Sequence, residues 1–182
     1  MNQELTFNEF FGKPVLVKII NLFLEDSDSQ FTQKQIIIKL KLAKASAVKW
    51  LRFLGELNLI KIEKRAVEKI YTLNKDYYII KQLKILNNLM KLELIKRLAE
   101  EYHVKGYLYG SSARGEDVKE SDIDILFLGK VRKEKIIQDI KRISTKINKN
   151  IKVEIYSEIE WAQMARKDSA FYERVEKDKI EL

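Results

Sequence analysis

The sequence predicts a two-domain protein of the α/β (α+β) class, and three observations lead to this prediction. Residues 31–73 have the pattern of helices followed by a two-stranded ribbon. Residues 104–128 have the pattern of a strand, a polar turn and a second strand. Between them, residues 76–102 repeat apolar side chains at the spacing of an amphipathic helix. We therefore expect two folded parts joined by helical chain.

The N-terminal part is predicted to contain three helices and a ribbon. Apolar side chains recur at helical spacing over residues 15–24. Thr32 and Gln35 have the spacing of a capping box and indicate the start of a second helix. A third helix is expected over residues 44–57. Alternating apolar and charged residues within 59–73, interrupted by a turn, predict the two strands of the ribbon.

Three helices and a ribbon in this order resemble the winged helix-turn-helix modules of small archaeal and bacterial regulators, and we assign residues 1–86 to such a domain. The resemblance implies that the third helix enters the major groove of DNA and that the ribbon contacts the backbone. The residues expected to bind DNA are basic: Lys44, Lys49, Arg52, Lys64 and Arg65. The alternative is a module that binds protein or forms a dimer, because Glu56 weakens the positive charge of the exposed face.

Charge and composition restrict the partners. The formal net charge is +8, and residues 1–90 hold 15 Lys or Arg against 9 Asp or Glu. This excess favours a polyanionic partner for the N-terminal half. The chain has no cysteine, and no apolar run approaches the roughly 20 residues of a membrane span. The N-terminus lacks the pattern of a signal peptide, so we expect a cytoplasmic protein with no membrane partner.

The apolar stripe of residues 76–102 is expected to connect the two domains. Asn87 and Asn88 form helices poorly, and we expect the helix to break near them. The predicted boundary therefore separates residues 1–86 from residues 87–182. The alternative use of this stripe is the seam of a homodimer.

Two aspartates mark the second strand of the C-terminal part. Side chains alternate between the faces of a strand, so Asp122 and Asp124 point the same way and Ile123 and Ile125 point the other way. Adjacent carboxylates repel each other unless a cation lies between them. Mg²⁺ takes oxygen ligands and usually retains waters and substrate phosphates. The pair is therefore the candidate metal site.

The turn between the strands begins with Gly110 and Ser111. Glycine lets the backbone approach a ligand closely, and a hydroxyl and exposed N–H groups are good donors to an anion. Either a D-x-D or a G-S pattern alone is common in proteins. The two together, at the two ends of one strand–turn–strand unit, are specific and indicate a phosphate site beside a metal site.

The pattern G-S-x10-D-x-D, formed by Gly110, Ser111, Asp122 and Asp124, resembles that of the minimal nucleotidyltransferases of the DNA polymerase β-like superfamily. The resemblance implies a palm with a mixed sheet for residues 87–182, an NTP such as ATP as substrate, and Mg²⁺ as cofactor. It implies transfer of a nucleoside monophosphate with release of pyrophosphate. By position, Gly110 and Ser111 would bind the nucleotide, and Asp122 and Asp124 would be catalytic and bind the metal.

The resemblance also implies a third carboxylate on a later strand, and Glu154 within residues 151–156 is the candidate. Its expected role is to help bind metal and to deprotonate the acceptor hydroxyl. The family often has Asp there, and the extra methylene of Glu moves the carboxylate. The alternative is a solvated glutamate on the polar face of a strand.

Three functions follow from these patterns. The first is an enzyme that modifies an acceptor hydroxyl, with a partner toxin protein as the favoured acceptor by resemblance. The second is a DNA-binding transcriptional regulator whose nucleotidyltransferase domain only binds nucleotide. The third is an antitoxin-like module that acts by contact alone.

Overall fold

The computed structural model describes residues 11–182, so the first ten residues of the predicted N-terminal domain lie outside the described part. The chain divides into two compact units, Met1–Lys81 and Gln82–Leu182. The division falls within helix α5 (Tyr78–Lys91), a few residues before the predicted boundary. A domain boundary at residue 87 stays a prediction.

The first unit combines helices with a three-stranded antiparallel sheet of order β1-β3-β2. Its elements are α2 (Pro14–Glu25), β1 (Phe31–Thr32), α3 (Gln33–Leu40), α4 (Lys44–Glu56), β2 (Ile60–Arg65) and β3 (Glu68–Leu73). The capping box at the start of α3 is confirmed, because the Thr32 hydroxyl accepts from the Gln35 N–H and the Gln35 side chain accepts from the Thr32 N–H. The three helices and the ribbon are therefore present as predicted, while the winged helix-turn-helix assignment stays a prediction.

Apolar side chains from the helices and the sheet form the core of this unit. Leu16 and Phe23 of α2 and Leu54 of α4 are fully buried. Phe23 and Phe31 pack edge to face with their ring centroids 5.3 Å apart. This core fixes α4 with its opposite face exposed.

The second unit is built on a four-stranded mixed sheet of order β6-β5-β4-β7. Its elements after α5 are α6 (Glu93–Glu101), β4 (Lys105–Tyr109), α7 (Gly110–Arg114), β5 (Ile123–Leu128), α8 (Lys133–Ile147), β6 (Ile151–Tyr156), α9 (Glu158–Lys167), α10 (Ser169–Asp178) and β7 (Ile180–Glu181). β4 pairs antiparallel with both β5 and β7, whereas β5 pairs parallel with β6. The predicted mixed sheet is therefore confirmed.

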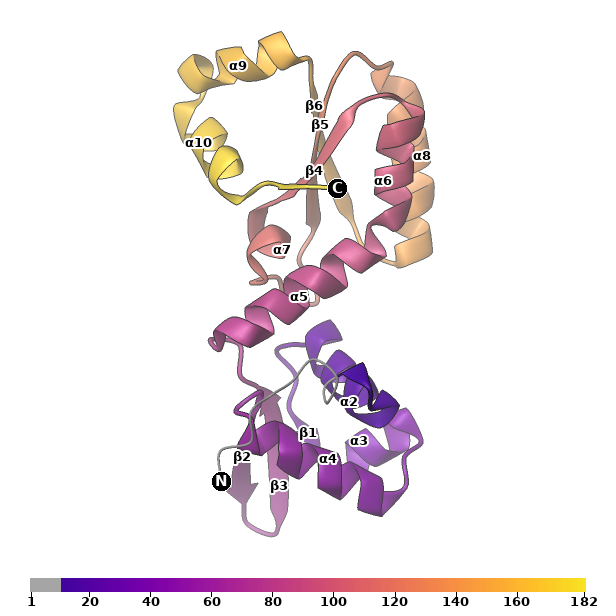
Figure 1. Ribbon diagram of the computed structural model, residues 1–182, viewed down its shortest axis with the longest axis vertical. Helices are drawn as coiled ribbons and strands as arrows, with labels where there is room; N and C mark the ends of the chain where they lie inside the picture. Colours follow the sequence, from indigo (N-terminus) through magenta and orange to yellow (C-terminus); the bar gives the residue numbers. More distant parts are fainter. Residues whose placement is uncertain (1–10) are drawn as a thin grey trace. The chain divides into compact units, whose positions relative to one another are not determined.

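Helices cover both faces of this sheet. Figure 1 shows α6 and α8 on one face and α9 and α10 on the other. The first face buries Leu108, Ile125 and Phe127 under α6 and α8. The second face carries an aromatic cluster that includes Tyr109 and Trp161. The candidate carboxylates lie on this second face, because residues two apart in a strand point the same way.

The helical connection breaks at Leu92 instead of near Asn87 and Asn88. α5 continues through both asparagines to Lys91, and α6 begins at Glu93. The Asn88 amide donates to Ser112 and Asp117, so tertiary hydrogen bonds outweigh its poor helix propensity. Leu92 is buried in the core at the break.

Within residues 11–182, the helices are too short or too polar to cross a membrane.

Candidate active site

Asp122 and Asp124 lie at the start of β5, on the face of the sheet that α9 and α10 cover. Asp124 stands in register with Tyr109 of β4 and with Lys152 of β6. Asp122 comes directly before the strand, two residues earlier and on the same face. The predicted side-by-side placement of the two carboxylates therefore follows from the strand geometry.

Gly110 lies against Asp124. Its φ of +74° is a conformation that side chains disfavour, and a Cβ placed on it would come within 2.5 Å of the Asp124 Oδ2 atom. A larger residue would be strained at this φ and would require the Asp124 carboxylate to move. Ser111 follows in α7, so the structure brings the G-S pair next to the second aspartate, as the sequence pattern predicts.

Both oxygens of Asp122 bind side chains at the start of β6. The Asn150 amide donates to Oδ1 at 2.8 Å, and the Lys152 ammonium lies 2.6 Å from Oδ2. The hydrogen bond from Lys152, assisted by that from Asn150, holds the pKa of Asp122 below its usual value. Asp122 is therefore ionised at neutral pH.

Asp124 is in a different electrostatic environment. Burial raises its pKa, although the positive charge of Lys152 opposes the shift. Burial, together with the negative charges of Asp124 and Glu154, also raises the pKa of Tyr109. The Tyr109 phenol is therefore neutral and lies close to the carboxylates.

Glu154 lies on the same face but farther along the sheet. It stands in register with Leu126, two residues beyond Asp124, and it accepts a hydrogen bond from the Tyr156 hydroxyl at 3.1 Å. Among residues 11–182, no group of three Asp, Glu or His side chains has a geometry that could hold a metal ion. Glu154 as a catalytic residue and third metal ligand stays a prediction.

The donor set of the aspartate pair fits Mg²⁺ as two carboxylate ligands. A hard divalent ion is commonly bound by one or two carboxylates and completes its shell with waters and substrate phosphates. Asp122 and Asp124 provide such a pair, and the backbone of Gly110 packs closely against Asp124. Any Mg²⁺ at this pair would have to replace the contact of Lys152 with Asp122.

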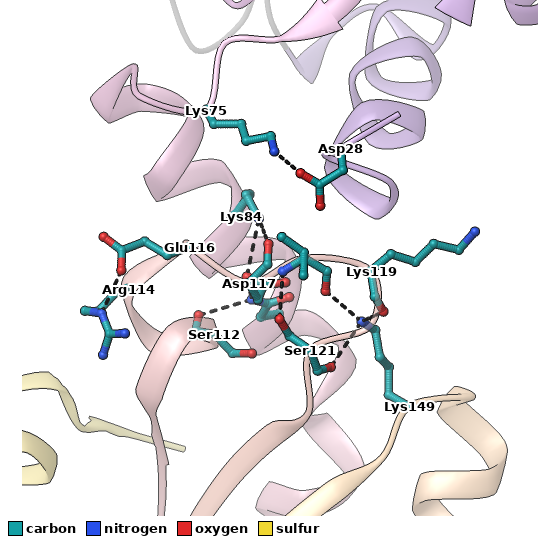
Figure 2. A network of polar contacts seen from close by, with 12 residues as sticks. Asp28, Lys75, Lys84, Ser112, Arg114, Glu116, Asp117, Lys119, Ser121 and Lys149 are labelled. Atoms are coloured by element: carbon teal, nitrogen blue, oxygen red, sulfur yellow. Dashed lines mark hydrogen bonds and ion pairs between the residues drawn. The ribbon is translucent and has the colours of Figure 1, made fainter. Parts of the chain in front are cut away.

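The segment between Ser111 and Asp122 is fixed by buried side chains of α5. Lys84, only 4% exposed, donates to the Asp117 carbonyl, and its ammonium lies 3.6 Å from the Asp117 carboxylate. Asn88 donates to the same carboxylate at 3.0 Å and to the Ser112 carbonyl at 3.1 Å. Figure 2 shows Lys84, Ser112 and Asp117 converging in this network. We call Lys84, Asn88 and Asp117 the α5 clamp.

A lysine near the start of β6 holds the other end of this segment. The Lys149 ammonium donates to the carbonyls of Val118, Lys119 and Ser121 at 3.3, 2.5 and 3.4 Å. Figure 2 shows Lys149 reaching Lys119 and Ser121. The turn that leads into Asp122 is therefore tied to both α5 and β6.

The site thus combines a glycine turn, two strand carboxylates and basic side chains, all in the second unit. Residues 91–180 match the model of the nucleotidyltransferase domain. This match includes the glycine turn and both aspartates, although not Lys84 and Asn88 of α5, and it indicates a transferase. The matched range starts at the last residue of α5 and contains strands β4, β5 and β6.

One similar solved structure comes from Sulfolobus solfataricus and is described, provisionally, as a nucleotidyltransferase. The two proteins are 28% identical, and the match covers 54% of this chain and 84% of the other, with a TM-score of 0.31. No curated protein matches the chain.

Sequence reasoning missed the polar side chains that surround the aspartates. Lys152 stands two residues before Glu154, so strand alternation would have placed both on one face. The role of Lys84 had no such signal, because a lysine in a helix is ordinarily exposed. Burial of Lys84 becomes apparent only when the turn of Asp117 is folded against α5.

The predicted DNA-binding residues lie on the exposed side of the first unit. Lys44, Lys49 and Arg52 line a shallow groove on α4. Arg52 pairs with Glu56 at 2.7 Å, and the Lys49 ammonium lies 4.9 Å from the Trp50 ring centroid. On the ribbon, Lys64 and Arg65 lie at the end of β2; Arg65 pairs with Glu63 at 2.9 Å and binds Gln30. DNA binding by these residues stays a prediction.

In metal-free protein, Asp124→Asn is expected to increase the free energy of unfolding at neutral pH. Burial raises the pKa of Asp124, so its ionisation costs stability above the folded-state pKa. This cost disappears as the pH falls below the usual aspartate value of about 4, because the carboxyl is then protonated in both states. The increase in the free energy of unfolding should therefore be largest at neutral pH. Urea unfolding in the presence of a chelator measures it.

Asp122→Asn is the matched control and should decrease the free energy of unfolding at neutral pH. The pKa of Asp122 is lowered, so its charge stabilises the folded state above the usual aspartate pKa, and this stabilisation is lost as the pH falls. Equal effects of the two substitutions, or a loss of stability in Asp124→Asn at neutral pH, would contradict this account.

Proposed function

We propose that the protein is a Mg²⁺-dependent nucleotidyltransferase that moves a nucleoside monophosphate from an NTP to an acceptor hydroxyl. The observation that carries the proposal is the contact of Gly110 with Asp124, which places a glycine turn directly beside a strand carboxylate. The nucleotidyltransferase domain match over residues 91–180 supports the same reaction class.

In this reaction the acceptor oxygen attacks the α-phosphorus, and the bond from that phosphorus to the bridging oxygen breaks. Pyrophosphate leaves, and the hydroxyl proton passes to Glu154. Gly110 and Ser111 would hold the triphosphate through backbone N–H groups and the serine hydroxyl. Asp122 and Asp124 would bind Mg²⁺, which supplies positive charge against the phosphate oxygens.

Positioning carries most of the catalysis in phosphoryl transfer, and this gives the α5 clamp a function. By binding the Ser112 carbonyl and the Asp117 side chain, Asn88 fixes the turn that follows Ser111. Lys149 fixes the approach to Asp122 from the other end. The phosphate donors and the carboxylates are thereby held in one arrangement.

A partner protein hydroxyl is the acceptor class that we favour, in a pairing of toxin and antitoxin type. The test is incubation of purified protein with Mg²⁺ and each α-labelled NTP, with the protein alone, with RNA and with proteins that co-purify from the native host. Covalent label on one acceptor, dependent on Mg²⁺, is the expected result. Absence of label on all acceptors, together with absence of NTP binding, would contradict the proposal.

A second candidate is a DNA-binding regulator, and it is favoured by the three basic side chains that line the groove on α4 together with Glu56 and apolar residues. Lys44→Ala/Lys49→Ala is expected to weaken binding to duplex DNA and to reduce the salt dependence of binding by about one unit of slope for each lost phosphate contact. Fluorescence anisotropy at two salt concentrations measures both quantities.

Lys96→Ala/Lys130→Ala removes the same charge from the second unit and serves as the control. Equal affinity of wild type and Lys44→Ala/Lys49→Ala would show that this face does not bind DNA.

A further inference from the structure

Lys152 contacts a carboxylate oxygen that a metal ion bound to Asp122 would need. Its ammonium lies 2.6 Å from the Asp122 Oδ2 atom, and Asn150 occupies the other oxygen. Lys152 also stands opposite Asp124 in the register of β5 and β6, so its side chain starts on the face of both aspartates. One ammonium thus neutralises part of the charge of two carboxylates.

The ion pair between Lys152 and Asp122 is exposed, so little free energy is needed to open it. The Lys152 side chain is 64% exposed, and ion pairs at the protein surface add little to stability because water screens them. A lysine ammonium also sits on a flexible four-carbon stem and can move to another anion nearby. Opening this pair therefore requires no rearrangement of the strand.

Charge determines when the pair should open. A divalent ion alone can bind Asp122 only by displacing the Lys152 ammonium. A metal–triphosphate complex brings both the cation for the carboxylates and anionic oxygens for the displaced ammonium, and lysine is a common point-charge ligand of phosphate. Metal and nucleotide should therefore bind better together than the metal does alone.

We propose that Lys152 is a built-in counter-ion that keeps metal off Asp122 until nucleotide arrives and then contacts the triphosphate. This inference rests on the proposed function, because it takes Asp122 and Asp124 as the metal ligands. It adds an order to the reaction: the metal enters the site with the nucleotide.

The test measures Mn²⁺ binding by electron paramagnetic resonance, first without nucleotide and then with ATP. Lys152→Met keeps an unbranched side chain that is one atom shorter and removes its charge. We expect it to bind Mn²⁺ about two- to fivefold more tightly than wild type without nucleotide, and to bind Mg²⁺–ATP about two- to fivefold more weakly in calorimetry, the range that loss of an exposed ion pair allows. Lys152→Arg, which retains the charge, should bind Mn²⁺ as wild type does.

Lys105→Met is the matched control. Lys105 is a similarly exposed lysine of the same sheet, paired with Glu158 at 3.1 Å, and its loss should leave both affinities unchanged. Equal Mn²⁺ affinity of Lys152→Met and wild type would overturn the inference, while metal-dependent ATP binding by wild type would leave the proposed function standing. No metal binding in any variant, with or without ATP, would overturn both.

Discussion

Asp122→Asn/Asp124→Asn is expected to lower the rate of nucleotidyl transfer by at least about 100-fold. Asn retains the shape of Asp but loses the charge that binds a divalent cation, and removal of groups that only support metal ligands already costs 10- to 100-fold. The measurement is the initial rate of Mg²⁺-dependent labelling of the acceptor from an α-labelled NTP.

Glu158→Gln is the control for this loss. Glu158 is an exposed carboxylate at the start of α9 that pairs with Lys105, and its neutralisation should leave the rate within about twofold of wild type, as for surface substitutions. A labelling rate in the double aspartate variant that equals the rate of Glu158→Gln would exclude the aspartate pair from catalysis.

The second large effect is expected from the α5 clamp. Lys84→Met should lower the free energy of unfolding by about 3 kcal/mol, because it removes the positive partner of a buried ion pair with Asp117. Urea unfolding followed by circular dichroism measures the loss.

Two further variants test whether the loss of stability in Lys84→Met comes from the α5 clamp. Lys96→Met removes an exposed lysine from α6 and should change stability by no more than about 0.5 kcal/mol. Adding Asp117→Asn to Lys84→Met should recover part of the loss, because the buried negative charge is then removed as well. If Lys84→Met costs no more than Lys96→Met, the clamp does not stabilise the fold.

The site residues that sequence could place are those whose position depends on a short-range rule. Alternation along a strand put Asp122 and Asp124 on one face. The sequence predicts a close approach of Gly110 to a ligand, whereas its contact with Asp124 appears only in the structure. The capping box at Thr32 is likewise a local pattern, and it is present as expected.

The residues that sequence could not place depend on contacts between distant segments. Lys84 and Asp117 are 33 positions apart, and only the folded turn against α5 makes one the partner of the other. The helix break moved to Leu92 for the same reason, since Asn88 gains tertiary hydrogen bonds that a propensity scale does not contain. Lys152 was accessible to the alternation rule, but its partner Asp122 lies on another strand.

The central claim is that Asp122 and Asp124 bind a metal–nucleotide complex beside Gly110. The most direct test is calorimetry of ATP and GTP binding with Mg²⁺ and with a chelator, in wild type and in Asp122→Ala/Asp124→Ala. We predict binding to wild type that requires Mg²⁺ and is absent from the variant. Metal-independent binding, or binding that the variant retains, would contradict the assignment of this site.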